Sequence, residues 1–180
     1  MKLTTKTMTQ CAIFSAFISL MSVITVPIGI IPVTLGLFGV MLAAVILGCK
    51  RSVISVIIYI LIGAIGIPVF SGFKGGVQVL AGPTGGYITS YILAAALVGF
   101  VSDRVKGNGI LAAAVLFIAS CLGTVICYTL GTLQFMLVSG NDFHTAVAKC
   151  VTIFIPVDIF KAMMAALIGT AVKKRLHYFD

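Results

Sequence analysis

The feature that most restricts the fold of this chain is a run without a single charged residue, which extends from Thr7 to Cys49. A membrane-spanning helix needs roughly 20 apolar residues, with a range of about 17–25, so this run is too long for one crossing. Pro27 and Pro32 interrupt it near its middle, and proline ends or kinks a helix. The run therefore predicts two membrane helices, near 7–26 and 33–49, joined by a short apolar turn.

The rest of the chain alternates in the same way between apolar runs and short polar segments. We expect further membrane helices near 52–67, 84–102, 109–137 and 150–172. Hydrophobic residues make up 61% of the chain and charged residues 9%, whereas an ordinary soluble domain is about 45–50% apolar and about 25% charged. The sequence thus predicts an all-α fold in which residues 1–180 form one membrane domain, a six-transmembrane-helix bundle.

The positions of the basic residues indicate how such a bundle is oriented, because Lys and Arg are enriched in the cytoplasmic loops of membrane proteins. Nine basic residues fall on one side of the predicted spans: Lys2, Lys6, Lys50, Arg51, Arg104, Lys106, Lys173, Lys174 and Arg175. Lys74 and Lys149 fall on the other side, and Lys161 lies inside the last span. We therefore expect both termini in the cytoplasm. The net charge of +8 then reflects membrane topology, and we expect no nucleic-acid partner.

Two opposite charges, Asp158 and Lys161, lie inside the last apolar run of a chain that has four acidic residues in all. A charge at the centre of a membrane helix costs roughly 2.5–3.5 kcal/mol on insertion scales, so such residues usually pair, line a cavity or bind something. Three residues apart on a helix, both side chains share one face. They predict the polar floor of a pocket; the alternative is a structural ion pair that locks this helix to a neighbour. Pro156 is expected to loosen the helix and free a backbone carbonyl that Lys161 could meet instead.

The segment from Pro68 to Gly86 holds six Gly and two Pro, yet it is largely apolar. Non-helical backbone at membrane depth is tolerated only where it is buried in protein or lines a cavity. We therefore predict a glycine-rich outward loop between the third and fourth helices that folds back over the pocket, where glycine lets the backbone approach a ligand closely. The alternative is that these glycines only shape an external cap.

The residues of this loop and its surroundings complete a set of candidates for substrate binding. Gln78 carries the only amide side chain of the loop, and Thr34 offers a hydroxyl group that could equally cap a helix. Tyr87 and Tyr91, one helical turn apart, offer aromatic surface and hydroxyl groups, unless they belong to an interfacial aromatic belt. The candidates are Asp158, Lys161, Gln78, Tyr87, Thr34, Gly82, Thr84 and Tyr91.

Other kinds of functional site are not indicated by the sequence. The five cysteines form no C-x-x-C motif and no Cys/His metal-ligand spacing, so we expect no metal site, disulfide framework or cofactor. Without a G-x-x-x-x-G-K-[ST] motif or any Glu, ATP binding and catalysis are not expected, and we predict that the chain is not an enzyme. Ala12 and Ala16 in the first helix are small residues four apart, which allows close helix packing. They indicate a face for a partner protein.

Three segments together resemble the BioY-type biotin transporter family: Gly63-Ala-Ile-Gly-Ile-Pro-Val-Phe70, Gly75-Gly…Gly82-Pro-Thr-Gly-Gly-Tyr87 and Pro156-Val-Asp-Ile-Phe-Lys161. The resemblance covers essentially the whole chain in length and in the order of motifs. It implies the substrate-binding S component of an energy-coupling-factor (ECF) vitamin transporter, with high-affinity biotin uptake across the prokaryotic cytoplasmic membrane. The implied partners are a transmembrane coupling protein and two ATP-binding-cassette (ABC) ATPases, besides membrane lipid.

This resemblance also assigns roles to particular residues. Asp158 and Lys161 correspond to a D-x-x-K motif whose side chains contact biotin, and Ala12 and Ala16 correspond to the face that meets the coupling protein. The only Arg of the fourth helix is Arg104, at its cytoplasmic end, so the resemblance assigns no anchor for the biotin carboxylate. Two other interpretations stay open: an S component for another small vitamin, and a non-transport membrane scaffold in which the Asp158–Lys161 pair is structural.

Overall fold

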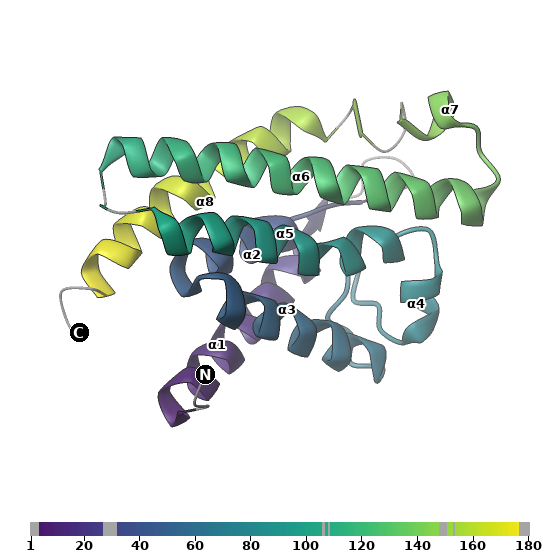
Figure 1. Ribbon diagram of the computed structural model, residues 1–180. Coiled ribbons are helices and arrows are strands. Elements are labelled where there is room, and N and C mark those ends of the chain that lie inside the picture. The colour runs from purple at the N-terminus through teal and green to yellow at the C-terminus, as the bar shows by residue number, and fades with distance from the viewer. Residues whose placement is uncertain are drawn as a thin grey trace.

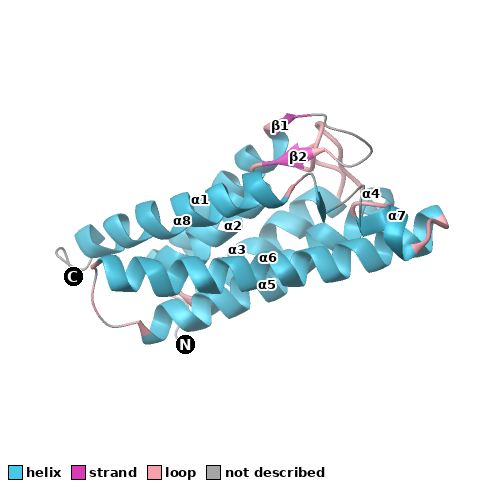
Figure 2. Cartoon of the chain, turned by 90° about the horizontal axis from the view of Figure 1, so that it is seen from above, coloured by secondary structure: helices cyan, strands magenta, loops and turns pink. Residues whose placement is uncertain are grey.

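The computed structural model describes residues 4–26, 32–105, 107, 109–147, 151–152 and 154–176. Its helices are α1 (Thr5–Val23), α2 (Gly36–Leu47), α3 (Cys49–Ala64), α4 (Val77–Ala81), α5 (Gly85–Arg104), α6 (Ile110–Ser139), α7 (Phe143–Val147) and α8 (Ile155–Leu176), and its strands are β1 (Thr25–Val26) and β2 (Val33–Thr34). Figure 1 shows the long helices packed in a bundle, with α4 and α7 at one end. Figure 2 shows β1 and β2 at that same end, whereas α8 finishes at the other.

Three of these helices are long and apolar enough to cross a membrane: α5, α6 and residues 155–175 of α8. Helix α2 is apolar but shorter. Each of the six predicted spans overlaps one long helix, namely α1, α2, α3, α5, α6 and α8 in chain order. The chain is therefore predominantly helical, as predicted, while the crossing of a membrane by all six helices stays a prediction.

The most extensive helix contact joins α5 and α6. Glycine permits it: a Cβ atom added at Gly86 would lie 2.6 Å from the carbonyl oxygen of Leu130 and 3.0 Å from the Cα atom of Gly131. Small residues let the backbones of membrane helices approach closely, and dispersion contacts then hold the helices together. These glycines fix α5 and α6 side by side beneath the loop that precedes α5.

The connection between α1 and α2 differs from the prediction of two helices reaching Val26 and starting at Val33. Instead β1 and β2 pair antiparallel, with Thr25 opposite Thr34 and Val26 opposite Val33, so both predicted spans are wrong at these ends. All four residues are β-branched, which favours extended backbone. Val26 also precedes a proline, which disfavours helical backbone. Residues 27–31, including Pro27 of the predicted turn, lie outside the described residues.

The junction of α2 and α3 also differs from the predicted boundary near residues 49–52. Gly48 ends α2 with a φ of +76°, a conformation that glycine adopts at little cost. The carboxylate of Asp103 then accepts a hydrogen bond of 3.0 Å from the backbone N–H of Cys49, which satisfies one of the unpaired donors at the start of α3. Helix α3 therefore begins before the basic Lys50 and Arg51, and not after them as predicted.

The glycine-rich segment between α3 and α5 packs against the bundle. The backbone N–H of Gly76 donates to the carbonyl of Gly63 at 2.7 Å. Phe70 is fully buried and meets the ring of Tyr59 edge-on, with ring centroids 5.5 Å apart. The segment is not irregular throughout, because it contains the short helix α4.

One side chain of α6, that of Gln134, holds the part of the glycine-rich segment that leads from α4 into α5. The amide nitrogen Nε2 of Gln134 donates to the carbonyls of Leu80 and Gly82, at 2.7 and 2.8 Å. Both bonds satisfy carbonyl groups near the end of α4 that have no continuing helix to accept from. Gln134 thus fixes the path of the chain into α5.

Helix α8 begins at Ile155 and places Pro156 in its first turn. Proline is tolerated there, because the first turn has no intrahelical acceptor for its missing N–H group. The prediction that Pro156 loosens the helix and frees a carbonyl for Lys161 is therefore wrong. Proline starts this helix, and the acceptor of Lys161 comes from another element.

Candidate binding site

A cavity of about 700 Å³, its open mouth included, lies at the end of the bundle that carries β2 and the glycine-rich segment. Its described lining comes from β2 and from all six long helices, together with Pro32 just before β2 and the loops before α4, α5 and α8. The lining residues are Ser22, Pro32, Val33, Thr34, Leu37, Tyr59, Ser71, Thr84, Tyr87, Ile88, Tyr91, Cys127, Tyr128, Phe154, Asp158 and Lys161. The cavity is thus a product of the whole fold and not of one motif.

Asp158 and Lys161 form an ion pair in the wall of this cavity. Helix α8 holds Asp158 in its first turn, where the positive end of the helix dipole stabilises a carboxylate. Nζ of Lys161 lies 2.8 Å from Oδ1 of Asp158, which confirms the predicted pairing on one helix face. The two residues are only 7% and 5% exposed, so each charge depends on the other for its compensation.

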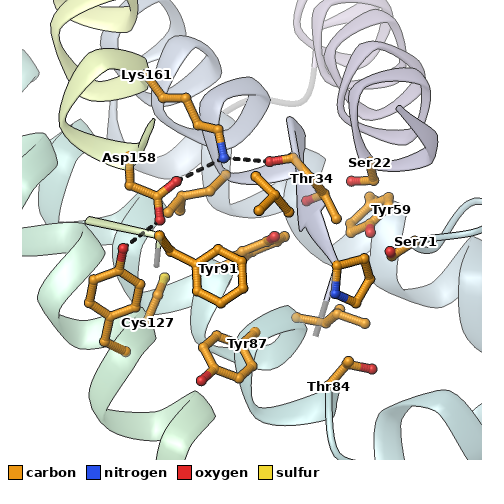
Figure 3. A pocket seen from close by; sticks show the side chains of 16 residues that line it. Ser22, Thr34, Tyr59, Ser71, Thr84, Tyr87, Tyr91, Cys127, Asp158 and Lys161 are labelled. Carbon is orange, nitrogen blue, oxygen red and sulfur yellow. Dashed lines mark hydrogen bonds and ion pairs between the residues drawn. The ribbon is translucent and has the colours of Figure 1, made fainter. Parts of the chain in front are cut away.

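Each member of this pair has a second partner on another element (Figure 3). Nζ of Lys161 donates to the backbone carbonyl of Thr34 in β2 at 2.7 Å. The hydroxyl group of Tyr128 in α6 donates to Oδ2 of Asp158 at 2.6 Å. The pair therefore joins α8 to β2 and α6, while both charged groups also border the cavity. A structural role and a ligand-binding role are physically compatible here.

Tyrosines form much of the remaining surface: four of the five in the chain line the cavity, namely Tyr59, Tyr87, Tyr91 and Tyr128. The hydroxyl groups of Tyr87 and Thr132 lie 3.2 Å apart, and the ring of Tyr91 is buried at 8% exposure. Tyr59 and Tyr128 were not among the predicted site residues. The chain has only five tyrosines, and this could have marked them as site candidates, because a tyrosine hydroxyl buried in a membrane protein needs a polar partner.

Most of the predicted substrate-binding residues meet at the cavity. Thr34, Thr84, Tyr87, Tyr91, Asp158 and Lys161 line it. The Oγ1 atom of Thr34 also accepts a hydrogen bond of 3.1 Å from the backbone N–H of Gly36 at the start of α2, while its contact with a substrate stays a prediction.

Two predicted residues, Gln78 and Gly82, are not among the described lining residues. Gln78 is exposed on α4, and its Nε2 donates to the carbonyl of Gly75 at 3.0 Å. The carbonyl of Gly82 accepts from Gln134, as described above. Sequence position alone did not reveal that α4 turns this amide outward. Ser71, from the same segment, lines the cavity instead.

Ala12 and Ala16 lie on an exposed face of α1, away from the cavity lining. Met8 and Leu20, one helical turn before and after them, are each 60% exposed. The spacing of four puts all of these residues on one stripe of the helix. The bundle leaves this apolar stripe uncovered.

The cavity can bind a small molecule that is apolar along most of its surface and polar at one end. A carboxylate acceptor and an ammonium donor lie side by side, and both give strong, charge-assisted hydrogen bonds in a dry site. Aromatic and aliphatic walls surround them, which is the usual make-up of a ligand pocket. Within the described residues, no group of three or more His, Cys, Asp or Glu side chains could hold a metal ion.

Comparisons with known proteins place the whole chain in one group of transporters. Residues 1–178 match the BioY family. The chain is 38% identical over 168 residues to the biotin transporter BioY of Thermotoga maritima, covering 92% of this chain and 94% of that protein. It is 36% identical over 177 residues to the biotin transporter BioY of Rhizobium etli, covering 94% of each. The fold matches the crystal structure of the S component for biotin from an ECF-type ABC transporter, with a TM-score of 0.87, 29% identity, and coverage of 94% of this chain and 91% of that one.

Proposed function

The chain belongs to the BioY family, and we propose that it captures biotin at the outer face of the cell membrane as the S component of an ECF-type transporter. The observation that carries the proposal is a cavity walled by tyrosines, with the Asp158–Lys161 pair in its lining. The apolar helices and the relatives make it a protein of the cell membrane. Its family is one of transporters, which is not an enzyme class.

The chemistry of biotin fits the two charged residues. The ureido ring of biotin offers two N–H donors, which suit the carboxylate of Asp158, and a carbonyl acceptor, which suits the ammonium group of Lys161. In a dry site such charge-assisted hydrogen bonds are roughly twice as strong as neutral ones. The thioether ring and the alkyl tail suit the tyrosine rings and the aliphatic walls.

We propose that transport itself needs other proteins. A transmembrane coupling protein and two ABC-type ATPases are the implied partners, since the chain has no phosphate-binding loop of its own. The exposed stripe of α1 that includes Ala12 and Ala16 is the proposed contact for the coupling protein, because small residues permit close approach between helices. In this arrangement six helices cross the membrane, both termini are cytoplasmic, and the cavity opens outward.

Isothermal titration of detergent-purified, biotin-depleted protein with biotin tests this function. Tight one-to-one binding is expected, with no comparable binding of thiamine or riboflavin. Asp158→Asn should reduce the affinity at least about 100-fold, because an interaction with a charged partner at a buried site is lost. The matched control is Asp142→Asn, since Asp142 is exposed outside the cavity, where hydrogen bonds from Thr145 lower its pKa. Its affinity should equal that of the wild type.

The outcomes separate the competing interpretations. Binding of thiamine or riboflavin in place of biotin would indicate an S component for another vitamin. No binding of any of these by a folded, monodisperse sample would favour a scaffold with a purely structural ion pair.

A further inference from the structure

The cavity changes in character from one side to the other. At one side Asp158 and Lys161 are buried, at 7% and 5% exposure. Ser71 and Thr84 lie across the cavity from this pair (Figure 3), and both are partly exposed. A ligand whose ureido ring meets the ion pair therefore extends its tail across the cavity, toward Ser71 and Thr84.

The positive charge of the described lining is confined to the side of the cavity that holds Asp158 and Lys161. Lys161 is the one Lys or Arg among the described lining residues. Its Nζ already donates to Asp158 and to the carbonyl of Thr34, at 2.8 and 2.7 Å. A tail carboxylate on the far side of the cavity thus meets no cation among the described lining residues there.

What the far side offers is hydroxyl groups with unused hydrogen-bonding capacity. Oγ of Ser71 is shielded from solvent and has no hydrogen-bond partner within the described residues. Thr84 precedes α5 as its N-cap residue, but its side chain makes no capping bond. A hydroxyl group is both donor and acceptor, so it can donate to a carboxylate and equally accept from an amide N–H.

We propose that Ser71 and Thr84 bind the end of the substrate tail through these neutral hydroxyl groups, and that the site therefore accepts biotin derivatives with an uncharged amide tail. This rests on the proposed binding of biotin. Selectivity then lies almost entirely at the ureido ring, where a wrong group leaves a buried charge unpaired. At the tail, the exchange of carboxylate for amide replaces charge-assisted hydrogen bonds with neutral ones to the same hydroxyl groups, so these bonds are weakened but not lost.

Competition titration with three probes tests the proposal on the full chain: biotin, biotinamide and 2-iminobiotin. Biotinamide, whose tail is neutral, should bind at most about 30-fold more weakly than biotin, since each of the two hydrogen bonds loses its charge assistance but is kept as a neutral bond. The control 2-iminobiotin is cationic at its ring at neutral pH. It should bind at least about 100-fold more weakly, because its charge faces Lys161.

Two variants test whether the hydroxyl groups of Ser71 and Thr84 bind the tail of the ligand. Ser71→Ala and Thr84→Val should each weaken the binding of biotinamide by about threefold to tenfold, as expected for one neutral hydroxyl hydrogen bond, and the binding of biotin by at least as much. Thr89→Val is the matched control, because Thr89 is exposed on α5 and its hydroxyl bonds the carbonyl of Gly85 in its own helix. It should leave both affinities unchanged.

The failure of this inference differs from the failure of the proposed function. If biotin binds tightly but biotinamide is more than about 100-fold weaker, a cation anchors the carboxylate and the inference is overturned alone. Unchanged affinities in both variants would also overturn it. If biotin itself does not bind, the proposed function fails and the inference falls with it.

Discussion

A double-mutant cycle on Asp158 and Lys161 would separate the structural role of the ion pair from its role in binding. Lys161→Met keeps the length of the side chain but leaves a carboxylate that is 7% exposed with the hydroxyl of Tyr128 as its remaining partner. Breaking a buried pair by removing one member typically costs about 3–5 kcal/mol. Asp158→Asn leaves the ammonium group of Lys161 with neutral acceptors only and no compensating charge, and should cost a similar amount of unfolding free energy.

The double variant has no buried charge left uncompensated. It still loses the hydrogen bond from Lys161 to Thr34, and a bond from a charged group contributes about 1.5–3 kcal/mol. We therefore expect the double variant to be more stable than either single variant. Its loss of unfolding free energy should fall short of the sum of the single losses by roughly 3 kcal/mol or more.

The assay is unfolding of the purified protein by SDS, followed by circular dichroism, with biotin titration of each folded variant. All three variants should lose tight biotin binding, because both charged groups are assigned to the ligand. Additive stability losses would refute the coupling across the 2.8 Å pair. Retained biotin binding in the stable double variant would show that the pair is only a lock.

Two further predictions concern residues that the sequence did not indicate. Tyr128→Phe removes the 2.6 Å hydrogen bond to Asp158; titration should show biotin affinity reduced by about tenfold or more, and an unchanged affinity would exclude a positioning role for this hydroxyl. Gln134→Leu releases the carbonyls of Leu80 and Gly82, so amide hydrogen exchange over 76–84 and the rate of biotin dissociation should both increase. Gln10→Leu is the control for Gln134→Leu. Equal amide hydrogen exchange over 76–84 in these two variants would contradict the prediction.

The long helices could be located from the sequence because their cause is local. A run of about 20 apolar residues must satisfy its own backbone in a membrane, and a helix does so within the segment. The errors lie at the ends of the runs. Thr25 and Thr34 pair across a hairpin, and Asp103 caps α3 from 54 positions away along the chain. Such partners are invisible to a pattern that examines one segment at a time.

The residues of the candidate site were likewise predictable only where the physical cause is local. Asp158 and Lys161 were predictable because a charge in an apolar run is costly wherever the helix packs, and their spacing fixes a common face. Gln78 was equally conspicuous in the sequence, yet it lies exposed on α4. Which face of a short helix turns inward depends on contacts with the rest of the fold, and periodicity over five residues cannot decide it.

Residue types along the chain were enough to predict its membrane character, the approximate positions of its long helices and the two charges that need a partner. These follow from the cost of moving polar groups into an apolar medium, which depends on residue type. In contrast, the packing of the folded chain is what brings Tyr128 and the carbonyl of Thr34 to the ion pair and places Ser71 and Thr84 across the cavity from it. The reason is physical: a hydrogen bond depends on distance and direction, and residues far apart in the chain acquire both only when the helices pack.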